Sequence, residues 1–219
     1  MEAYYSVLRS CPLFAGIREE GLASLLECLG ARTAAYPPKT VILSEGEPAR
    51  DMGIVLAGAA QIVRVDFFGN RSIVADVGPG ELFGESFACA GVEVLPVDVV
   101  AREETRVLLL NCRRILEPCS GACGFHQQLL FNLMQVTARK NLAFHKKLEV
   151  VSCRTTREKL LTYLHQQAKQ FNSSSFTIPY DRQELADYLE VERSGLSAEI
   201  GRLRREGVLE SDRSWFRLL

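Results

Sequence analysis

The sequence lacks several features that would place it in common functional classes. No apolar run in its 219 residues approaches the ~20 that a transmembrane helix requires, and the opening MEAYYSVLRSCPLF lacks the basic and apolar regions of a signal peptide. Residues 33–110 contain no histidine, which disfavours a metal-dependent enzyme built on a cupin-type barrel. We therefore expect a cytoplasmic protein without enzymatic activity, membrane partner, resident metal or cofactor.

The cysteines and the charges exclude two further classes. Seven cysteines without regular spacing form an odd set, so a secreted disulfide framework is disfavoured and reduced thiols are expected. The formal net charge is -1, but residues 1–118 hold 11 basic against 16 acidic residues, whereas residues 119–151 hold four against one. The bulk charge does not indicate a nucleic-acid partner, so such an assignment depends on where individual cations lie.

The first half of the chain is rich in short runs of β-forming residues. Before them, residues 18–30 have apolar residues at helical spacing and end on glycine, which predicts a short amphipathic helix. From residue 33 to residue 110, β-type runs alternate with turns such as Gly46-Glu47-Pro48. A parallel sheet would need helical crossovers between its strands, so a compact antiparallel barrel or jelly roll is predicted instead.

Glycine and proline are then absent from residue 125 to residue 151. Within this stretch a series recurs at alternating steps of four and three: Leu130, Met134, Thr137, Asn141, Phe144, Leu148 and Val151. This heptad pattern predicts one long helix that pairs with a second copy of the chain, with the polar Thr137 and Asn141 fixing its register. The alternative is a long helix that lies on its own barrel.

The last third of the chain has the pattern of a helix-turn-helix. Asp181 and Glu184 are spaced as a capping box, and the small Ala186 lies on the inner face of the helix that follows. A turn at residues 190–192 precedes a second amphipathic helix that ends at Gly207, and VLESDRSWFRLL predicts a closing hairpin. These linked features predict a module for double-stranded DNA, although a small helical subdomain with charged faces is the alternative.

The start of the second helix carries the candidate DNA contacts. Arg193 can donate two hydrogen bonds to a guanine, and Ser194 and Ser197 can contact a base or a phosphate. Glu199 could accept a hydrogen bond from a cytosine amine or orient Arg193. Phosphate contacts, which position the protein without specifying sequence, are expected from Arg182, Arg202, Arg204, Arg205 and Arg213.

These residues resemble the cyclic-AMP receptor protein and fumarate-nitrate regulator (Crp/Fnr) family over nearly the whole chain. The resemblance rests on RQELADYLEVERSGLSAEIGRLRREGVLE, Gly46-Glu47-Pro48, GIVLAGAAQIVR and GPGELFGE. It implies an α+β fold with a cyclic-nucleotide-binding-like jelly roll (1–124), a dimerisation helix (125–151) and a winged helix-turn-helix (152–219). It also implies a bacterial transcription regulator that binds a two-fold symmetric operator as a homodimer, with RNA polymerase as a further partner.

The resemblance also shows where this chain departs from the nucleotide-binding members. In those members Phe-Gly-Glu is followed by an arginine that neutralises the cyclic phosphate, whereas Phe83-Gly84-Glu85 is followed here by Leu95-Pro96-Val97-Asp98. A buried phosphate without a paired cation is costly, so cyclic AMP is not expected, and Glu85 could be structural, accepting backbone N–H bonds. An unidentified small-molecule effector is expected in or near the barrel, close to Gly84, Glu85, Leu95, Val97, Asn141 and Phe144.

Two further features bear on what the protein recognises and senses. Ser194 and Ala198 stand where many family members have Glu and Arg, so the operator is expected to differ from the common one. Cys112, Cys119 and Cys123, followed by His126, could hold an iron-sulfur centre or zinc, or form a disulfide. The alternative is an inert role, because free cysteine is common among buried residues.

Overall fold

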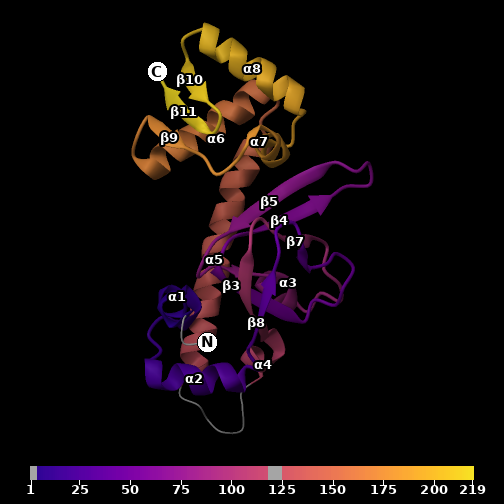
Figure 1. Cartoon of the computed structure of the whole chain (residues 1–219), viewed down its shortest axis with the longest axis vertical. Helices are drawn as coiled ribbons and strands as arrows, with labels where there is room; N and C mark the ends of the chain where they lie inside the picture. The colour runs from indigo at the N-terminus through magenta and orange to yellow at the C-terminus, as the bar shows by residue number, and fades with distance from the viewer. Residues whose placement is uncertain (1–3, 118–124) are drawn as a thin grey trace. The chain divides into compact units, whose positions relative to one another are not determined.

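The computed structural model describes residues 4–117 and 125–219, which form two compact units (Figure 1). The first unit contains the residues up to Val65 together with Val74–Lys140, and the second contains Asp66–Ile73 together with Asn141–Leu219. One long helix contributes residues to both units. Within the described residues, no helix combines the length and the apolar character needed to cross a membrane.

Two four-stranded sheets build the N-terminal unit. One sheet has the order β1-β8-β3-β6, from β1 (Arg32–Tyr36), β8 (Thr105–Asn111), β3 (Asp51–Ala57) and β6 (Leu82–Phe83). The other has the order β2-β7-β4-β5, from β2 (Val41–Leu43), β7 (Asp98–Ala101), β4 (Ala60–Val65) and β5 (Arg71–Val77). Neighbours such as β3 and β8 pair antiparallel. The predicted jelly roll is therefore confirmed.

Strand β3 shows how one sheet separates two hydrophobic cores. Met52, Ile54 and Leu56 lie in a core shared with α1 (Tyr5–Ser10), the 3-10 helix η2 (Pro12–Phe14) and α2 (Glu19–Cys28). Val55, which points to the opposite face, belongs to the core between the two sheets. Because successive side chains of a strand alternate in direction, a strand buried on both faces has a continuous apolar run, as in GIVLA.

The N-terminal unit also contains two short helices that the sequence pattern did not predict. Helix α3 (Glu85–Ala90) follows Gly84, whose φ of 76° is in the left-handed region that favours glycine. A Cβ at this position would lie 3.2 Å from the Asp51 carbonyl oxygen, so a residue larger than glycine would crowd the backbone at this turn. Helix α4 (Cys112–Leu116) continues directly from β8, and the Asn111 side chain accepts a hydrogen bond from the Arg113 amide.

The long helix α5 (His126–Val151) confirms the helix predicted over residues 125–151. Leu129, Leu133 and Val136 on one side of it are buried in the core of the N-terminal unit. Four apolar residues of the heptad series are exposed in the single chain, with exposed fractions of 37% for Leu130, 60% for Met134, 44% for Phe144 and 58% for Leu148, whereas Val151 is half-buried. Helix α5 thus packs on its own domain and still leaves an apolar seam uncovered.

The C-terminal unit is a winged helix-turn-helix, as predicted. It contains α6 (Thr156–Phe171), β9 (Ser175–Thr177), α7 (Arg182–Leu189), α8 (Arg193–Arg205), β10 (Leu209–Asp212) and β11 (Trp215–Leu218), with a sheet of order β10-β11-β9 (Figure 1). Thr155 caps α6 in a capping box with Glu158, and Asn172 ends that helix in a left-handed conformation. The Thr155 cap explains why α6 begins as a separate helix after α5, and Asn172 explains where α6 ends.

Candidate nucleic-acid interface and sensor site

The helix-turn-helix is held by caps at its ends and by apolar side chains at its centre. An Asp181 carboxylate oxygen accepts a hydrogen bond from the Glu184 amide at 2.8 Å, and Glu184 accepts one from the Asp181 amide at 3.0 Å. Helix α7 ends at Leu189, and the residue after it, Glu190, has a φ of 54° and turns the chain toward α8. The inner face of α8, formed by Leu196, Ile200 and Leu203, is buried as predicted.

The opposite face of α8 presents polar side chains at the start of the helix. Arg193, Ser194 and Ser197 are all exposed. The residue before the helix, Glu192, caps no backbone amide with its side chain, so the N–H groups of the first turn are left without a side-chain cap. Free amides and the positive end of the helix dipole favour an anion such as a phosphate at this position.

Glu199 lies in a network of ion pairs between α6 and α8. Glu199 is only 8% exposed, and its carboxylate is paired with the Arg157 guanidinium at 3.4 Å and with the Arg202 guanidinium at 3.1 Å. Arg157 of α6 also pairs with Glu206, the residue that follows α8, at 2.6 Å. The network therefore joins α6 to the middle and to the C-terminal end of α8. The carboxylate of Glu199 thus has two cationic partners, one on α6 and one on α8. Its predicted contact with a cytosine or with Arg193 stays a prediction.

The predicted phosphate contacts fall into two groups. Arg182 is half-buried: it donates a hydrogen bond to the Ser211 hydroxyl at 3.3 Å, and its guanidinium lies 5.0 Å from the Phe216 ring centroid. Burial lowers the pKa of its guanidinium, and these contacts tie α7 to the wing. Side chains with greater exposure follow at the end of α8 and at the tip of the wing, namely Arg202, Arg204, Arg205 and Arg213.

A buried ion pair occupies the predicted effector region of the N-terminal unit. Glu85 is 2% exposed, and its carboxylate accepts hydrogen bonds from the Lys140 ammonium at 2.9 Å and from the Ser86 hydroxyl at 3.0 Å. Lys140 also donates to the Leu82 carbonyl. The structural interpretation of Glu85 therefore fits this environment, but its partner is an ammonium group of α5 rather than the expected backbone amides. Lys140 was not singled out from the sequence, where it is one of several cations on a polar helix.

The segment that replaces the phosphate-binding arginine contains two buried apolar side chains and no cation. Leu95 and Val97 are buried, and the Leu95 amide and carbonyl bond to the Glu47 carbonyl at 2.8 Å and to the Gly46 amide at 2.9 Å. Of the other predicted effector residues, Asn141 and Phe144 are exposed on the part of α5 that belongs to the second unit. The six predicted effector residues are thus divided between the two units, and their grouping into one effector site stays a prediction.

The predicted cysteine cluster is divided by the structure. Cys119 and Cys123 lie outside the described residues. Cys112 is buried and its sulfur lies 2.7 Å from that of Cys89, while the His126 ring nitrogen Nε2 lies 3.1 Å from the Arg114 carbonyl. In residues 4–117 and 125–219, no three His, Cys, Asp or Glu side chains are placed to hold a metal ion. Cys89 was not predicted, because 23 residues separate it from Cys112.

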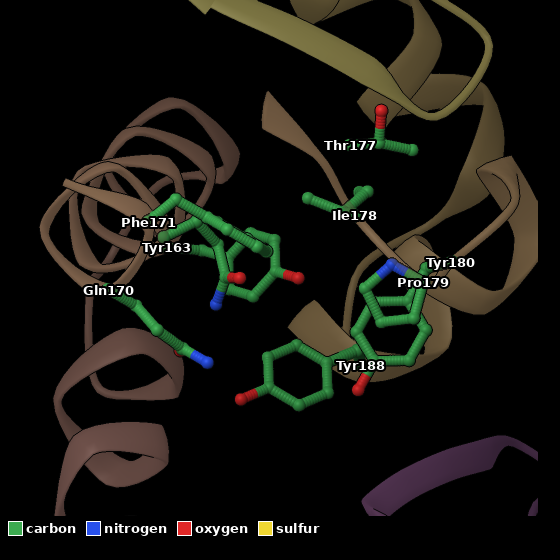
Figure 2. Close-up of a pocket in the computed structure, with 9 residues that line it drawn as sticks. Tyr163, Gln170, Phe171, Thr177, Ile178, Pro179, Tyr180 and Tyr188 are labelled. Carbon is green, nitrogen blue, oxygen red and sulfur yellow. The ribbon is translucent and has the colours of Figure 1, made fainter. Parts of the chain in front are cut away.

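A pocket of about 540 Å³ lies in the C-terminal unit and not in the predicted effector region. Figure 2 shows Tyr163, Gln170 and Phe171 of α6 across this pocket from Ile178 and neighbouring residues. The ring centroids of Tyr163 and Tyr180 lie 5.2 and 5.0 Å from that of Tyr188, so the three rings support one another. The pocket wall therefore also stabilises the packing of α6 on α7.

Comparisons with known proteins agree with this architecture. Residues 33–120 match the cyclic nucleotide-binding domain, and residues 158–219 match the Crp-like helix-turn-helix domain. The chain is 25% identical to the transcriptional activator protein FnrA of Stutzerimonas stutzeri, over 81% of this chain and 72% of the relative. It is 26% identical to the cyclic AMP receptor protein of Thermus thermophilus, over 92% of this chain and 89% of the relative.

A solved structure shows the same fold at lower identity. The c-di-GMP responsive global regulator CLP of Xanthomonas campestris superposes with a TM-score of 0.74 and 18% identity, over 90% of this chain and 98% of that structure. The order of sensor domain, long helix and winged helix-turn-helix is thus common to this chain and to its relatives. This chain belongs to the Crp/Fnr family of DNA-binding transcription regulators.

Proposed function

We propose that this protein is a homodimeric transcription regulator that recognises a two-fold symmetric operator through Arg193. The observation that carries the proposal is the start of α8, where Arg193, Ser194 and Ser197 are exposed on a helix whose opposite face is buried. In a helix-turn-helix, residues at this position contact base edges in the major groove. An arginine there suits the two acceptors of a guanine, and the exposed Arg204 suits a backbone phosphate.

The exposed seam of α5 supports the dimeric state. Leu130 and Met134 precede the polar Thr137 and Asn141 on this seam, and Phe144 and Leu148 follow them, so two exposed apolar pairs lie on one side of the helix. Exposed apolar surface of this kind marks interaction sites. The spacing of these residues is that of a coiled coil, so a second copy of the same helix is the partner that fits the pattern. Two α8 helices related by the dimer axis would then enter successive major grooves, which accounts for a two-fold symmetric operator.

The proposed effector is a small molecule other than a cyclic nucleotide. Leu95 and Val97 supply no cation for a cyclic phosphate, and the Glu85 carboxylate that would meet the ribose is already paired with Lys140. The names of two relatives refer to cyclic AMP and to c-di-GMP, and we do not extend either effector to this chain. The effector would act by favouring one of two dimer states that differ in affinity for DNA.

Selection from a random double-stranded DNA library tests the central claim. We expect the purified full chain to enrich a two-fold symmetric sequence and to sediment as a dimer at the concentrations that bind it. Thermal unfolding with added cyclic AMP or c-di-GMP should leave the transition temperature unchanged, because a ligand that binds the native state raises it. Enrichment of asymmetric half-sites by a monomer would contradict the proposal, and stabilisation by either nucleotide would contradict the assignment of the effector.

A further inference from the structure

The packing of α3 against α4 brings two cysteines into contact. Cys89 in α3 and Cys112, the first residue of α4, have their sulfur atoms 2.7 Å apart. Both are free thiols, and both belong to or pack against the main core of the N-terminal unit. A disulfide holds its sulfur atoms at about 2.05 Å, so the pair needs less than about 1 Å of movement to become covalent.

The two thiols differ in environment in a way that gives them different chemical roles. Cys112 is 1% exposed, whereas Cys89 keeps part of its surface open to solvent. The hydrogen bond with Cys112 lowers the pKa of the Cys89 thiol, and the same bond together with burial raises the pKa of Cys112. The thiolate is the reactive form of cysteine, so the accessible Cys89 suits the attacking group and the sheltered Cys112 suits the group that completes a disulfide.

The charged groups around this pair link it to the long helix. Glu85 lies four residues before Cys89, so both side chains share one face of α3. The Glu85 carboxylate raises the pKa of Cys89, but less than the Cys112 hydrogen bond lowers it, and this carboxylate is paired with Lys140 of α5. Helix α3 is therefore connected to α4 by the sulfur pair and to α5 by the buried ion pair.

We infer that Cys89 and Cys112 are a redox-active pair that a hydroperoxide oxidises to a reversible disulfide. The Cys89 thiolate attacks a peroxide oxygen, the O–O bond breaks, and the displaced oxygen leaves as water or an alcohol after taking a proton. The resulting Cys89 sulfenic acid is then attacked by the Cys112 sulfur, which loses its proton, and a second water leaves as the S–S bond forms. The peroxide is reduced by two electrons, and an external dithiol restores both thiols by exchange.

The disulfide would act on DNA binding through α5, and this regulatory consequence rests on the proposed function. Residues 129, 133, 136 and 140 form the stripe of α5 that faces its own domain, while 130, 134, 137 and 141 form the seam one residue further along. A shift of α3 changes the Glu85–Lys140 contact and so acts on α5 beside the seam. Coupling between two sites typically changes the affinity for a ligand by about 5–150-fold. We expect the disulfide to change the affinity for the operator by a factor in this range.

Peptide mapping of the full-length protein tests the disulfide directly. The reduced chain is treated with hydrogen peroxide, alkylated and digested with trypsin, which separates Cys89 (residues 72–102), Cys112 (residues 107–113) and the pair Cys119 and Cys123 (residues 115–139). We expect the first two peptides to be cross-linked, and dithiothreitol to separate them. A cross-link that involves residues 115–139 instead, or two unlinked oxidised peptides, would overturn the inference.

Variants separate the disulfide from DNA recognition. Cys112→Ser should leave a sulfenic acid on Cys89 that dimedone traps, and Cys89→Ser should make operator affinity insensitive to peroxide. The double variant Cys119→Ser/Cys123→Ser is the matched control and should respond as the wild type does. A wild-type protein that is cross-linked but binds its operator with unchanged affinity would overturn the regulatory step. A reduced protein that selects no DNA would contradict the proposed function, and the peptide map would still show whether the disulfide forms.

Discussion

The substitution Arg193→Ala is the sharpest test of how this protein recognises DNA. In the described part of the chain the Arg193 side chain is exposed and forms no ion pair, and alanine is an excellent helix former at the same position. The free energy of unfolding should therefore change by less than about 0.5 kcal/mol, as is usual for surface substitutions. Any loss of operator binding can then be assigned to the interface and not to unfolding.

The expected loss follows from one bidentate contact in each half of the operator. Such a contact discriminates by about 1–3 kcal/mol, and the two half-sites of a symmetric dimer give about 2–6 kcal/mol. At 1.4 kcal/mol for each factor of ten, affinity for the selected operator should fall by about 30-fold to about 10⁴-fold. Affinity for random DNA should change much less, because non-specific binding depends on the total of the phosphate contacts.

Arg204→Ala is the matched control, since it removes the same side chain from the exposed face near the end of the same helix. If Arg204 contacts a phosphate, specific and random DNA should lose affinity equally. The slope of log affinity against log salt should also become shallower by about 0.9 for each lost contact. Competition binding at several salt concentrations measures both variants. Equal losses of Arg193→Ala on the operator and on random DNA would show that Arg193 only holds phosphate, and would refute the assignment.

Three further predictions concern the scaffold. Leu148→Glu should weaken the proposed dimer by about 3–6 kcal/mol, because each of the two leucines contributes about 1.5–3 kcal/mol when it is buried. Val94→Glu, at an exposed position away from the seam, should leave the dimer unchanged. Sedimentation at several protein concentrations measures the dimer affinity of both variants, and equal affinities would contradict the prediction. Lys140→Met should cost about 3 kcal/mol in urea unfolding by leaving the Glu85 carboxylate buried without its cation, and Glu85→Gln in the same chain should restore most of it. Asp181→Ala should remove about 1 kcal/mol, and an unchanged denaturation midpoint would exclude the cap.

The elements that the sequence predicted well are those whose signals are local. The capping box of Asp181 and Glu184, the turn before α8 and the buried positions Leu196 and Ile200 all depend on residues within a few positions of one another. The same is true of α5, whose boundaries follow from the absence of glycine and proline. The short helices α3 and α4 escaped prediction because five or six residues carry too little periodicity to distinguish a helix from a loop.

The side-chain contacts that the sequence did not predict join segments that are distant in the chain. Glu199 is spaced correctly to face DNA, but Arg157 of α6 lies 42 residues earlier in the chain and draws its carboxylate inward. Lys140 reaches Glu85 across 55 residues, and Cys89 meets Cys112 across 23. The sequence gives no sign of either contact, because the spatial distance between the side chains depends on how α3, α4 and α5 pack on the sheet. The cysteines were grouped by nearness in the chain, and the fold grouped them differently.

Helix α5 packs on its own domain with one stripe and leaves the adjacent stripe for the second copy of the chain that we propose. The stripe that ends at Lys140 is fixed by the core and by Glu85, while the neighbouring stripe through Thr137 and Asn141 remains open. Positions one residue apart on a helix are separated by 100° (360° over 3.6 residues), so the helix cannot rotate to improve one face without disturbing the other. In the dimer proposed above, a small change at α3 would act on α5 through the Glu85–Lys140 contact, beside the residues that would meet the second α5 helix.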